Sequence, residues 1–326
     1  MKKRIISVLL ATVFALSVIG CGTKDTKEQD AYRQYGITCM ESGKYEDAVK
    51  AFQNALGESI GHIGEKELDI CFYKAKAQAL DGKTKDALAT YNAIIKYNKD
   101  ARAYYLRGDL YMDMGEEKKG RADFESAVQQ GKKNYEIYIG IYESLSRHEK
   151  KDEGQKYLSA AMEIKGDKPE DELYKGRISY LLGENKDAIS YLEKAKEHKQ
   201  MLASYYLGLA YDANGDSDKA KKCIAEYIKS GVATSYDLYE LGMQEMQDGN
   251  YKNALTYFNS GLELEKVPNK QNLMKSAIAA YEYSGDFDSA KKMMKEYLKA
   301  YPDDEEAKHE NTFLAVSYTH LTLPTN

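Results

Sequence analysis

Residues 238–262, LYELGMQEMQDGNYKNALTYFNSGL, decide the fold of this chain. Gly242 is followed by Gly249, Ala254 and Phe258 at intervals of seven, five and four residues, and residues 32–56 repeat this spacing. Glycine inside a helix costs about 1 kcal/mol relative to alanine, so a chain that places it at a fixed register must recover that cost by packing. The pattern therefore predicts two helices that cross closely at their small residues.

This four-residue frame returns along the chain with a period near 34. Six copies keep the spacing, and their first small residues are Gly36, Ala75, Gly108, Gly176, Gly208 and Gly242. Two copies depart from it. The fourth keeps Gly140 and Gly154 but has a turn two residues longer, through Arg147, and the eighth has Ile278 at the first position. With no alternating run long enough to build a sheet, we expect an all-α protein.

The glycine between the two predicted helices marks where the first one ends, as in the pair Gly249–Asn250. A helix–turn–helix unit of this length and signature resembles the tetratricopeptide repeat, or TPR. The resemblance covers residues 31–302. It implies a right-handed superhelical solenoid of about eight repeats, and residues 303–314 are expected to form a capping helix.

The first 20 residues predict where the protein is located. Three basic residues precede an apolar run over residues 5–19, which has the dimensions of a signal peptide. The run ends in LSVIGC at Cys21, which resembles the lipobox of bacterial lipoproteins. The resemblance implies a signal peptide over residues 1–20, a lipid on Cys21, a polar tether over residues 21–30 and a position on the extracytoplasmic side of the cell membrane. An uncleaved anchor and plain secretion remain alternatives.

The end of the chain has a different character. Residues 316–325, VSYTHLTLPT, have no charge and no helical period, and they resemble the translation of an adapter used in sequencing libraries. We therefore expect residues 315–326 to be non-native, with an ordinary frayed tail as the alternative.

The charge balance argues against nucleic acid as a partner. The chain has 47 Lys and Arg against 52 Asp and Glu, and removal of the leader leaves 44 against 52. A net acidic protein has no electrostatic reason to bind nucleic acid. Besides Cys21, the cysteines are Cys39, Cys71 and Cys223, an odd number on predicted helices, so we expect core thiols rather than a disulfide framework.

No motif indicates catalysis. The histidines are scattered along the chain, at His62, His148, His198, His309 and His320. None has the spacing of a metal site, and no phosphate-binding loop, nucleophile elbow or dinucleotide fingerprint is present. We expect a protein that is not an enzyme and that has no cofactor, no metal and no small-molecule substrate.

The TPR resemblance also implies a binding surface. In TPR proteins the first helix of each repeat lines a concave groove. The residues that this predicts as groove-lining are Tyr105, Tyr180, Leu202, Tyr205, Leu209, Tyr236, Tyr239 and Met243. Tyrosine and methionine suit peptide recognition. The alternative is that these side chains pack between neighbouring repeats.

One TPR subtype is disfavoured. TPRs that clamp a C-terminal carboxylate carry Lys or Arg and Asn along the groove, whereas here the first repeats have Arg33 with Ile37 and Phe72 with Lys76. The leading hypothesis is a membrane-anchored scaffold that binds protein or peptide through apolar anchors. A second is binding of a cell-envelope glycan or other polymer by tyrosine stacking, and a third is an enzyme with an unrecognised site.

Overall fold

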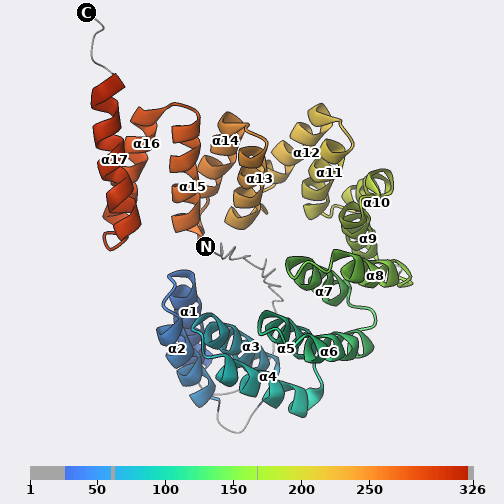
Figure 1. The fold of residues 1–326 in the computed structure, drawn as a ribbon. Helices are drawn as coiled ribbons and strands as arrows, with labels where there is room; N and C mark the ends of the chain where they lie inside the picture. Colours follow the sequence, from blue (N-terminus) through green and yellow to red (C-terminus); the bar gives the residue numbers. More distant parts are fainter. Residues whose placement is uncertain (1–25, 60–62, 167, 322–326) are drawn as a thin grey trace, which may run out of the picture. The chain divides into compact units, whose positions relative to one another are not determined.

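The computed structural model describes residues 26–59, 63–166 and 168–321, and side chains up to Leu314. Seventeen α-helices and no strand are present in these ranges, as the frame predicts. The chain divides into two compact units, Thr23–Val232, here the first unit, and Ala233–Asn326, the second unit. Within each unit, successive helices pack side by side as pairs (Figure 1).

The first unit contains twelve helices in the described residues. They are α1 (Thr26–Glu41), α2 (Tyr45–Gly57), α3 (Glu65–Leu80), α4 (Thr84–Asn98), α5 (Ala101–Asp113), α6 (Glu117–Gln130), α7 (Tyr135–Arg147), α8 (Lys151–Met162), α9 (Pro169–Leu182), α10 (Asn185–Glu197), α11 (Leu202–Ala213) and α12 (Ser217–Lys229).

The second unit contains two further pairs and a last helix in the described residues. They are α13 (Ser235–Gln247), α14 (Tyr251–Leu262), α15 (Lys270–Tyr283), α16 (Phe287–Ala300) and α17 (Glu305–Leu321). The odd-numbered helices are the first helices of their repeats. The pairing therefore gives eight repeats and one additional helix.

The frame's first and fourth residues meet where the two helices of a repeat cross. A Cβ atom added to Gly36 would lie 2.6 Å from the ring of Phe52, and one added to Gly108 would lie 2.8 Å from the ring of Phe124. Both rings are fully buried. Glycine is required because any side chain there would push the two helices apart.

The second residue of the frame ends the first helix. Gly43 has a φ of +70°, which is the left-handed region that glycine adopts without steric cost. The next backbone N–H, that of Lys44, donates to the carbonyl of Cys39 at 2.8 Å and closes the turn. This confirms the predicted helix ends.

The turn of the fourth repeat, between α7 and α8, differs from the prediction. Glu149 has a φ of 62°, and the N–H of Lys150 donates to the carbonyl of Leu145 at 2.8 Å, so the turn has the same length and bonding as the turn at Gly43. The predicted two-residue extension through Arg147 is therefore wrong.

The frame of the fourth repeat begins at Tyr142 rather than at Gly140. Gly154 supplies the space for Tyr142, because a Cβ on Gly154 would lie 3.1 Å from the Cα of Tyr142. Gly140 instead faces the preceding repeat, where a Cβ would meet the ring of Tyr105 at 2.6 Å.

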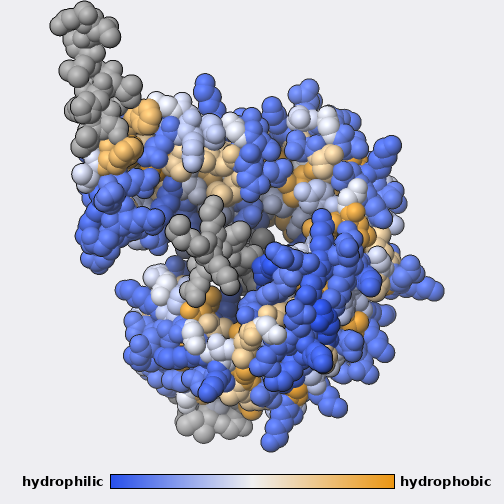
Figure 2. Space-filling model, in the orientation of Figure 1, coloured by the Kyte–Doolittle hydropathy of each residue, from blue (hydrophilic) through white to orange (hydrophobic). Residues whose placement is uncertain are grey.

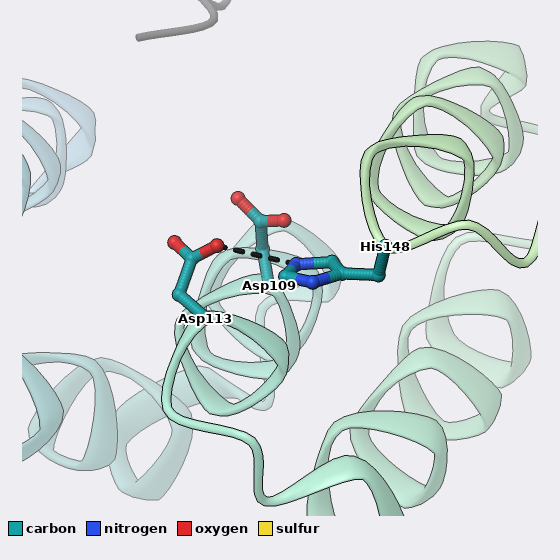
Figure 3. Close-up of side chains that lie close together, drawn as sticks. All are labelled: Asp109, Asp113 and His148. Carbon is teal, nitrogen blue, oxygen red and sulfur yellow. Dashed lines mark ion pairs between the residues drawn. The ribbon is translucent and has the colours of Figure 1, made fainter. Parts of the chain in front are cut away.

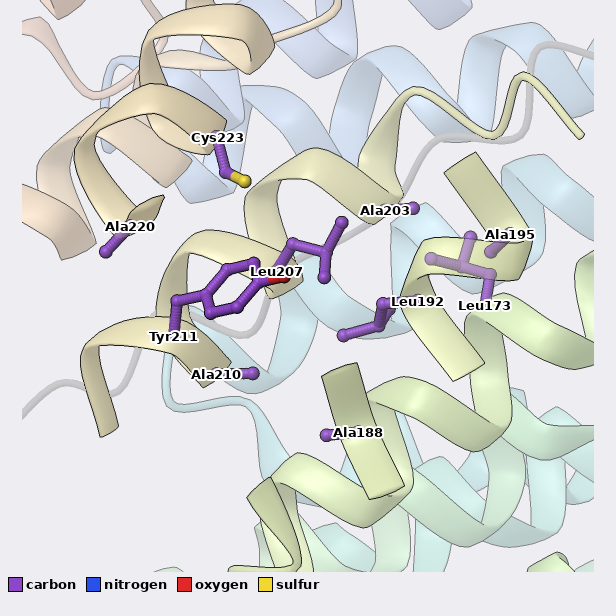
Figure 4. Close-up of a cluster of buried hydrophobic side chains, with 10 residues drawn as sticks. All are labelled: Leu173, Ala188, Leu192, Ala195, Ala203, Leu207, Ala210, Tyr211, Ala220 and Cys223. Carbon is purple, nitrogen blue, oxygen red and sulfur yellow. The ribbon is translucent and has the colours of Figure 1, made fainter. Parts of the chain in front are cut away.

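The core continues from one repeat to the next within each unit. Figure 4 shows buried side chains from α9, α10, α11 and α12 in one cluster that includes Leu192, Leu207 and Cys223. Cys39 and Cys223 are buried, Cys71 is half-buried, and all three are free. The prediction of core thiols holds for the two buried ones.

Helix α17 packs on the last helix pair. Ala307 and Leu314 join the cluster around Met274 and Met294. At its start, the Asp304 carboxylate accepts from the N–H of Ala307 at 3.1 Å. The helix covers the end of the second unit at residues 305–314, where the cap was predicted, and it continues to Leu321.

Candidate interaction surface on the first helices

The first helices of successive repeats contact one another within each unit: α1 with α3, α5 with α7, α9 with α11, and α13 with α15. Each of these helices has one side that faces away from the second helix of its repeat. We call the surface formed by these sides the first-helix face. The predicted groove residues were assigned to this face. Five of them lie in the first unit and three in the second, so the structure describes one such surface in each unit.

In the first unit, charged residues link the first helices. Arg33 of α1 donates to Asp69 of α3 at 2.6 Å, and Arg147 at the end of α7 pairs with Asp109 of α5. Each pair joins residues one repeat apart. The ion pairs therefore occupy surface that a partner would otherwise contact.

Arg177 of α9 extends this series. It reaches two carboxylates of α7, Glu136 at 3.4 Å and Glu143 at 3.1 Å, and its side chain is only 12% exposed. Burial raises the pKa of Glu143, and the charge of Arg177 opposes that shift. Arg177 thus compensates two carboxylates that would be costly to leave unpaired.

A group of potential metal ligands lies in the same series. Figure 3 shows Asp109 and Asp113, one turn apart on α5, with His148 approaching from the end of α7. His148 Nε2 lies 3.2 Å from Asp113 Oδ1, and one ligand atom from each residue falls within 4.8 Å of the others. Burial and the charge of Asp109 raise the pKa of Asp113. Because Arg147 already supplies a cation to Asp109, we interpret the group as one ion pair between repeats with a histidine–carboxylate contact beside it.

The predicted groove residues of the first unit are unequally exposed. Tyr105 is 8% exposed with its ring against Gly140, and Tyr205 is 9% exposed with its ring centroid 5.3 Å from that of Tyr227. These two side chains pack between helices, which was the alternative interpretation. Tyr180, Leu202 and Leu209 are half-buried.

In the second unit the predicted residues form a half-buried row on α13. Tyr236, Tyr239 and Met243 keep part of their surface accessible. The ring centroid of Tyr239 lies 6.2 Å from that of Phe258, and the Ser276 hydroxyl of α15 lies 3.6 Å from the Met243 sulfur. One side of this row therefore packs against the core, and the other side is partly accessible to solvent.

The sequence analysis missed one exposed aromatic side chain on the last helix. Phe313 on α17 is 67% exposed, next to the buried Leu314. In Figure 2, apolar residues are grouped at the end of the second unit where α16 and α17 lie. The repeat frame gave no signal of this exposure, because Phe313 stands 35 residues after Ile278, which is buried.

A hollow of about 560 Å³ lies between α2, α3 and α4. Its wall includes Leu68, Cys71 and Ile94 and is mostly apolar. Burial raises the pKa of the Cys71 thiol, which keeps it protonated and a poor nucleophile. The Cys71 thiol therefore does not make this hollow a nucleophilic site.

The predicted leader and Cys21 lie outside the described residues. Among the helices that the structure does describe, none combines the length and the apolar character needed to cross a membrane.

Comparisons with known proteins agree with the repeat frame. Two tetratricopeptide repeat models match the chain, one over residues 74–135 and the other over residues 202–230 and 271–304. The described chain is therefore an all-α helical-repeat fold whose residues 74–135, 202–230 and 271–304 match tetratricopeptide repeats. None of the curated proteins matches the chain.

Among solved structures, the chain is similar to a tetratricopeptide repeat protein from Parabacteroides merdae, with 12% identity, a TM-score of 0.46, and coverage of 78% of this chain and 98% of that one. It is also similar to PilW, a type IV pilus biogenesis factor, with 18% identity, a TM-score of 0.43, and coverage of 64% and 97%. A third is a chain of the APC/C hetero-tetramer Cut9-Hcn1, with 16% identity, a TM-score of 0.43, and coverage of 87% and 55%.

Proposed function

We propose that this protein is a non-enzymatic scaffold that binds protein or peptide partners through its first helices. We further propose that a lipid on Cys21 holds it at the extracytoplasmic side of a bacterial cell membrane. The repeat fold is of a type suited to binding partners. The membrane anchor rests on the lipobox resemblance at the end of the apolar run.

The observation that carries the binding proposal is the row Tyr236, Tyr239 and Met243 on α13. These side chains are large, apolar in most of their surface, and only half-buried. Apolar area removed from water contributes about 25 cal/mol per Å², so a partner that covers the row gains from it. Tyrosine and methionine also lose little in adapting to a partner's surface.

Catalysis has less support. The group nearest to a catalytic arrangement, Asp109, Asp113 and His148, takes part in contacts between repeats, Asp109 with Arg147 and Asp113 with His148. The hollow beside Cys71 offers a protonated thiol. Both features are accounted for by packing and by charge compensation.

Partner capture tests the binding proposal. The full chain carrying Tyr239→Ala and Met243→Ala should recover at least about fivefold less cross-linked envelope protein than the unchanged chain. A matched control carries Tyr97→Ala in α4, where the ring is exposed, and should capture normally. Circular dichroism should show that both variants remain helical.

Equal capture by the Tyr239 and Met243 variant would exclude this row as the binding surface. Retention of purified envelope polymer, with no captured protein, would instead favour the glycan-binding alternative.

Cell fractionation tests the anchor. Cys21→Ala should move the protein from the membrane fraction, because the thiol that carries the lipid is lost. Cys71→Ala serves as the control and should leave the distribution unchanged. Full membrane retention of the Cys21 variant would contradict the lipid anchor.

A further inference from the structure

The two helix layers of the second unit carry opposite charge. The first helices α13, α15 and α17 contain seven Asp and Glu against three Lys. The second helices α14 and α16 contain two Asp and Glu against five Lys. Negative charge is therefore concentrated on the first-helix side of this unit.

Three of these carboxylates have no cation beside them. In the described part of the second unit, Lys275 pairs with Asp304 and Glu306, and Lys308 pairs with Glu305. Of the other five carboxylates on the first helices, Asp237 accepts from the N–H of Thr234 and Glu245 accepts from the side chain of Asn253. The last three, one on each first helix, take part in no ion pair or side-chain hydrogen bond of the described residues: Glu240, Glu282 and Glu310.

The surroundings of two of these carboxylates, the exposed Glu240 and the half-buried Glu282, disfavour the charged form. Burial raises the pKa of Glu240, and the charge of Asp237 adds to the shift. Burial also raises the pKa of Glu282, and here the charge of Glu310 on α17 adds to it. A cation brought to this face would favour the charged form of both carboxylates.

Apolar side chains share this face with the carboxylates. Glu240 lies three residues before Met243, and Glu310 lies three residues before Phe313, so each pair occupies one side of its helix. Met243 is half-buried and Phe313 is exposed. We call Glu240, Met243, Glu282, Glu310 and Phe313 together the acidic face.

We propose that the acidic face binds a basic amphipathic polypeptide segment of a partner protein. Its Lys or Arg side chains pair with Glu240, Glu282 and Glu310, and its apolar side chains cover Met243 and Phe313. This inference rests on the proposed binding function and names the chemistry of the partner. Charge complementarity supplies the selectivity, and the apolar contacts supply the area.

A pair of synthetic peptides tests the charge requirement. One probe is a fluorescein-labelled amphipathic helix of about 18 residues that contains only leucine and lysine, and the other replaces each lysine with glutamate. Fluorescence anisotropy measures binding to the purified full chain in a neutral detergent, with detergent alone as the blank. The lysine peptide should bind at least about tenfold more tightly, and added salt should weaken it.

Substitutions locate the site. The variant E240Q/E282Q/E310Q should bind the lysine peptide at least about fivefold more weakly. The control E263Q/E265Q/E296Q removes the same charge from exposed positions outside the first helices and should bind within about twofold of the unchanged chain. Phe313→Ala should also weaken binding without loss of helix content.

Three results would overturn the proposal: no binding of the lysine peptide, equal binding of the glutamate peptide, or equal loss in the two triple variants. The capture experiment separates this failure from that of the proposed function. If Tyr239→Ala with Met243→Ala abolishes capture while the lysine peptide does not bind, the chain remains a scaffold for partners that are not basic.

Discussion

The first-helix faces of the two units differ in which of their charged residues are paired. In the first unit, Arg33, Arg147 and Arg177 each pair with a carboxylate of a neighbouring first helix. In the second unit, Lys275 of α15 pairs with Glu306 of α17, whereas Glu240 and Glu282 have no such partner among the described residues. The same repeat frame therefore supports a face closed by internal ion pairs and a face open to external ones.

The physical reason is the direction in which the residues point. Frame residues such as Gly36 and Phe52 face the other helix of their own repeat and determine its packing. Residues on the opposite side of the first helix make no part of that crossing. The frame therefore does not specify them, and their contacts differ from repeat to repeat.

Removal of the charge of Arg177 should destabilise the first unit, because this residue links α9 to α7 by ion pairs. Arg177→Gln leaves Glu136 and Glu143 without their partner, and we expect a loss of about 2 to 3 kcal/mol. Hydrogen exchange resolved by helix should show faster exchange in α7 and α9. Arg102→Gln is the control because its side chain is 53% exposed, and it should change little. Equal effects of the two substitutions would contradict a supporting role for Arg177.

A second comparison concerns the aromatic residues of the two faces. Tyr105→Ala should destabilise the first unit by about 3 kcal/mol, because it empties space between α5 and α7. Phe313→Ala should change stability by less than about 0.5 kcal/mol, because the ring is mostly in solvent. Urea unfolding followed by circular dichroism measures both. A large loss for Phe313 would show that its ring supports the fold.

The smallest expected effect is a pH-dependent gain in the stability of the folded protein when Glu282 is replaced by glutamine. Its pKa is raised in the folded state, so the folded protein holds a proton more tightly than the unfolded chain does. Stability therefore falls as the pH rises from the ordinary glutamate value through the folded value. Glu282→Gln should raise the urea midpoint at pH 7 by an amount worth less than about 1 kcal/mol, and the gain should vanish near pH 4. A gain that persists at pH 4 would point to a cause other than the charge.

Much of the fold was predictable because it is repeated. One spacing, written eight times, identified the helix pairs, the turn glycines and the close crossings. The register of the fourth repeat was predicted wrongly because Tyr142 and Glu149 occupy positions where small residues are expected. Gly140, two residues earlier, was taken as the first residue of the frame instead. Only the turn geometry at Glu149 revealed the true register.

The candidate surface was predictable in position but not in exposure. Register arithmetic places both Tyr105 and Tyr239 on the first-helix face. Whether such a ring stays accessible depends on the next repeat, where Gly140 admits the ring of Tyr105. The spacing of the frame contains no information about that neighbour.

The amino-acid sequence by itself determined the helix-pair architecture, because the steric demand of a close crossing is local and leaves glycine or alanine at a fixed interval. Only the tertiary structure decided which charges of the first helices are neutralised and which remain open. Those pairings join residues about one repeat apart, such as Arg147 and Asp109, and they depend on distances in space that no local pattern specifies.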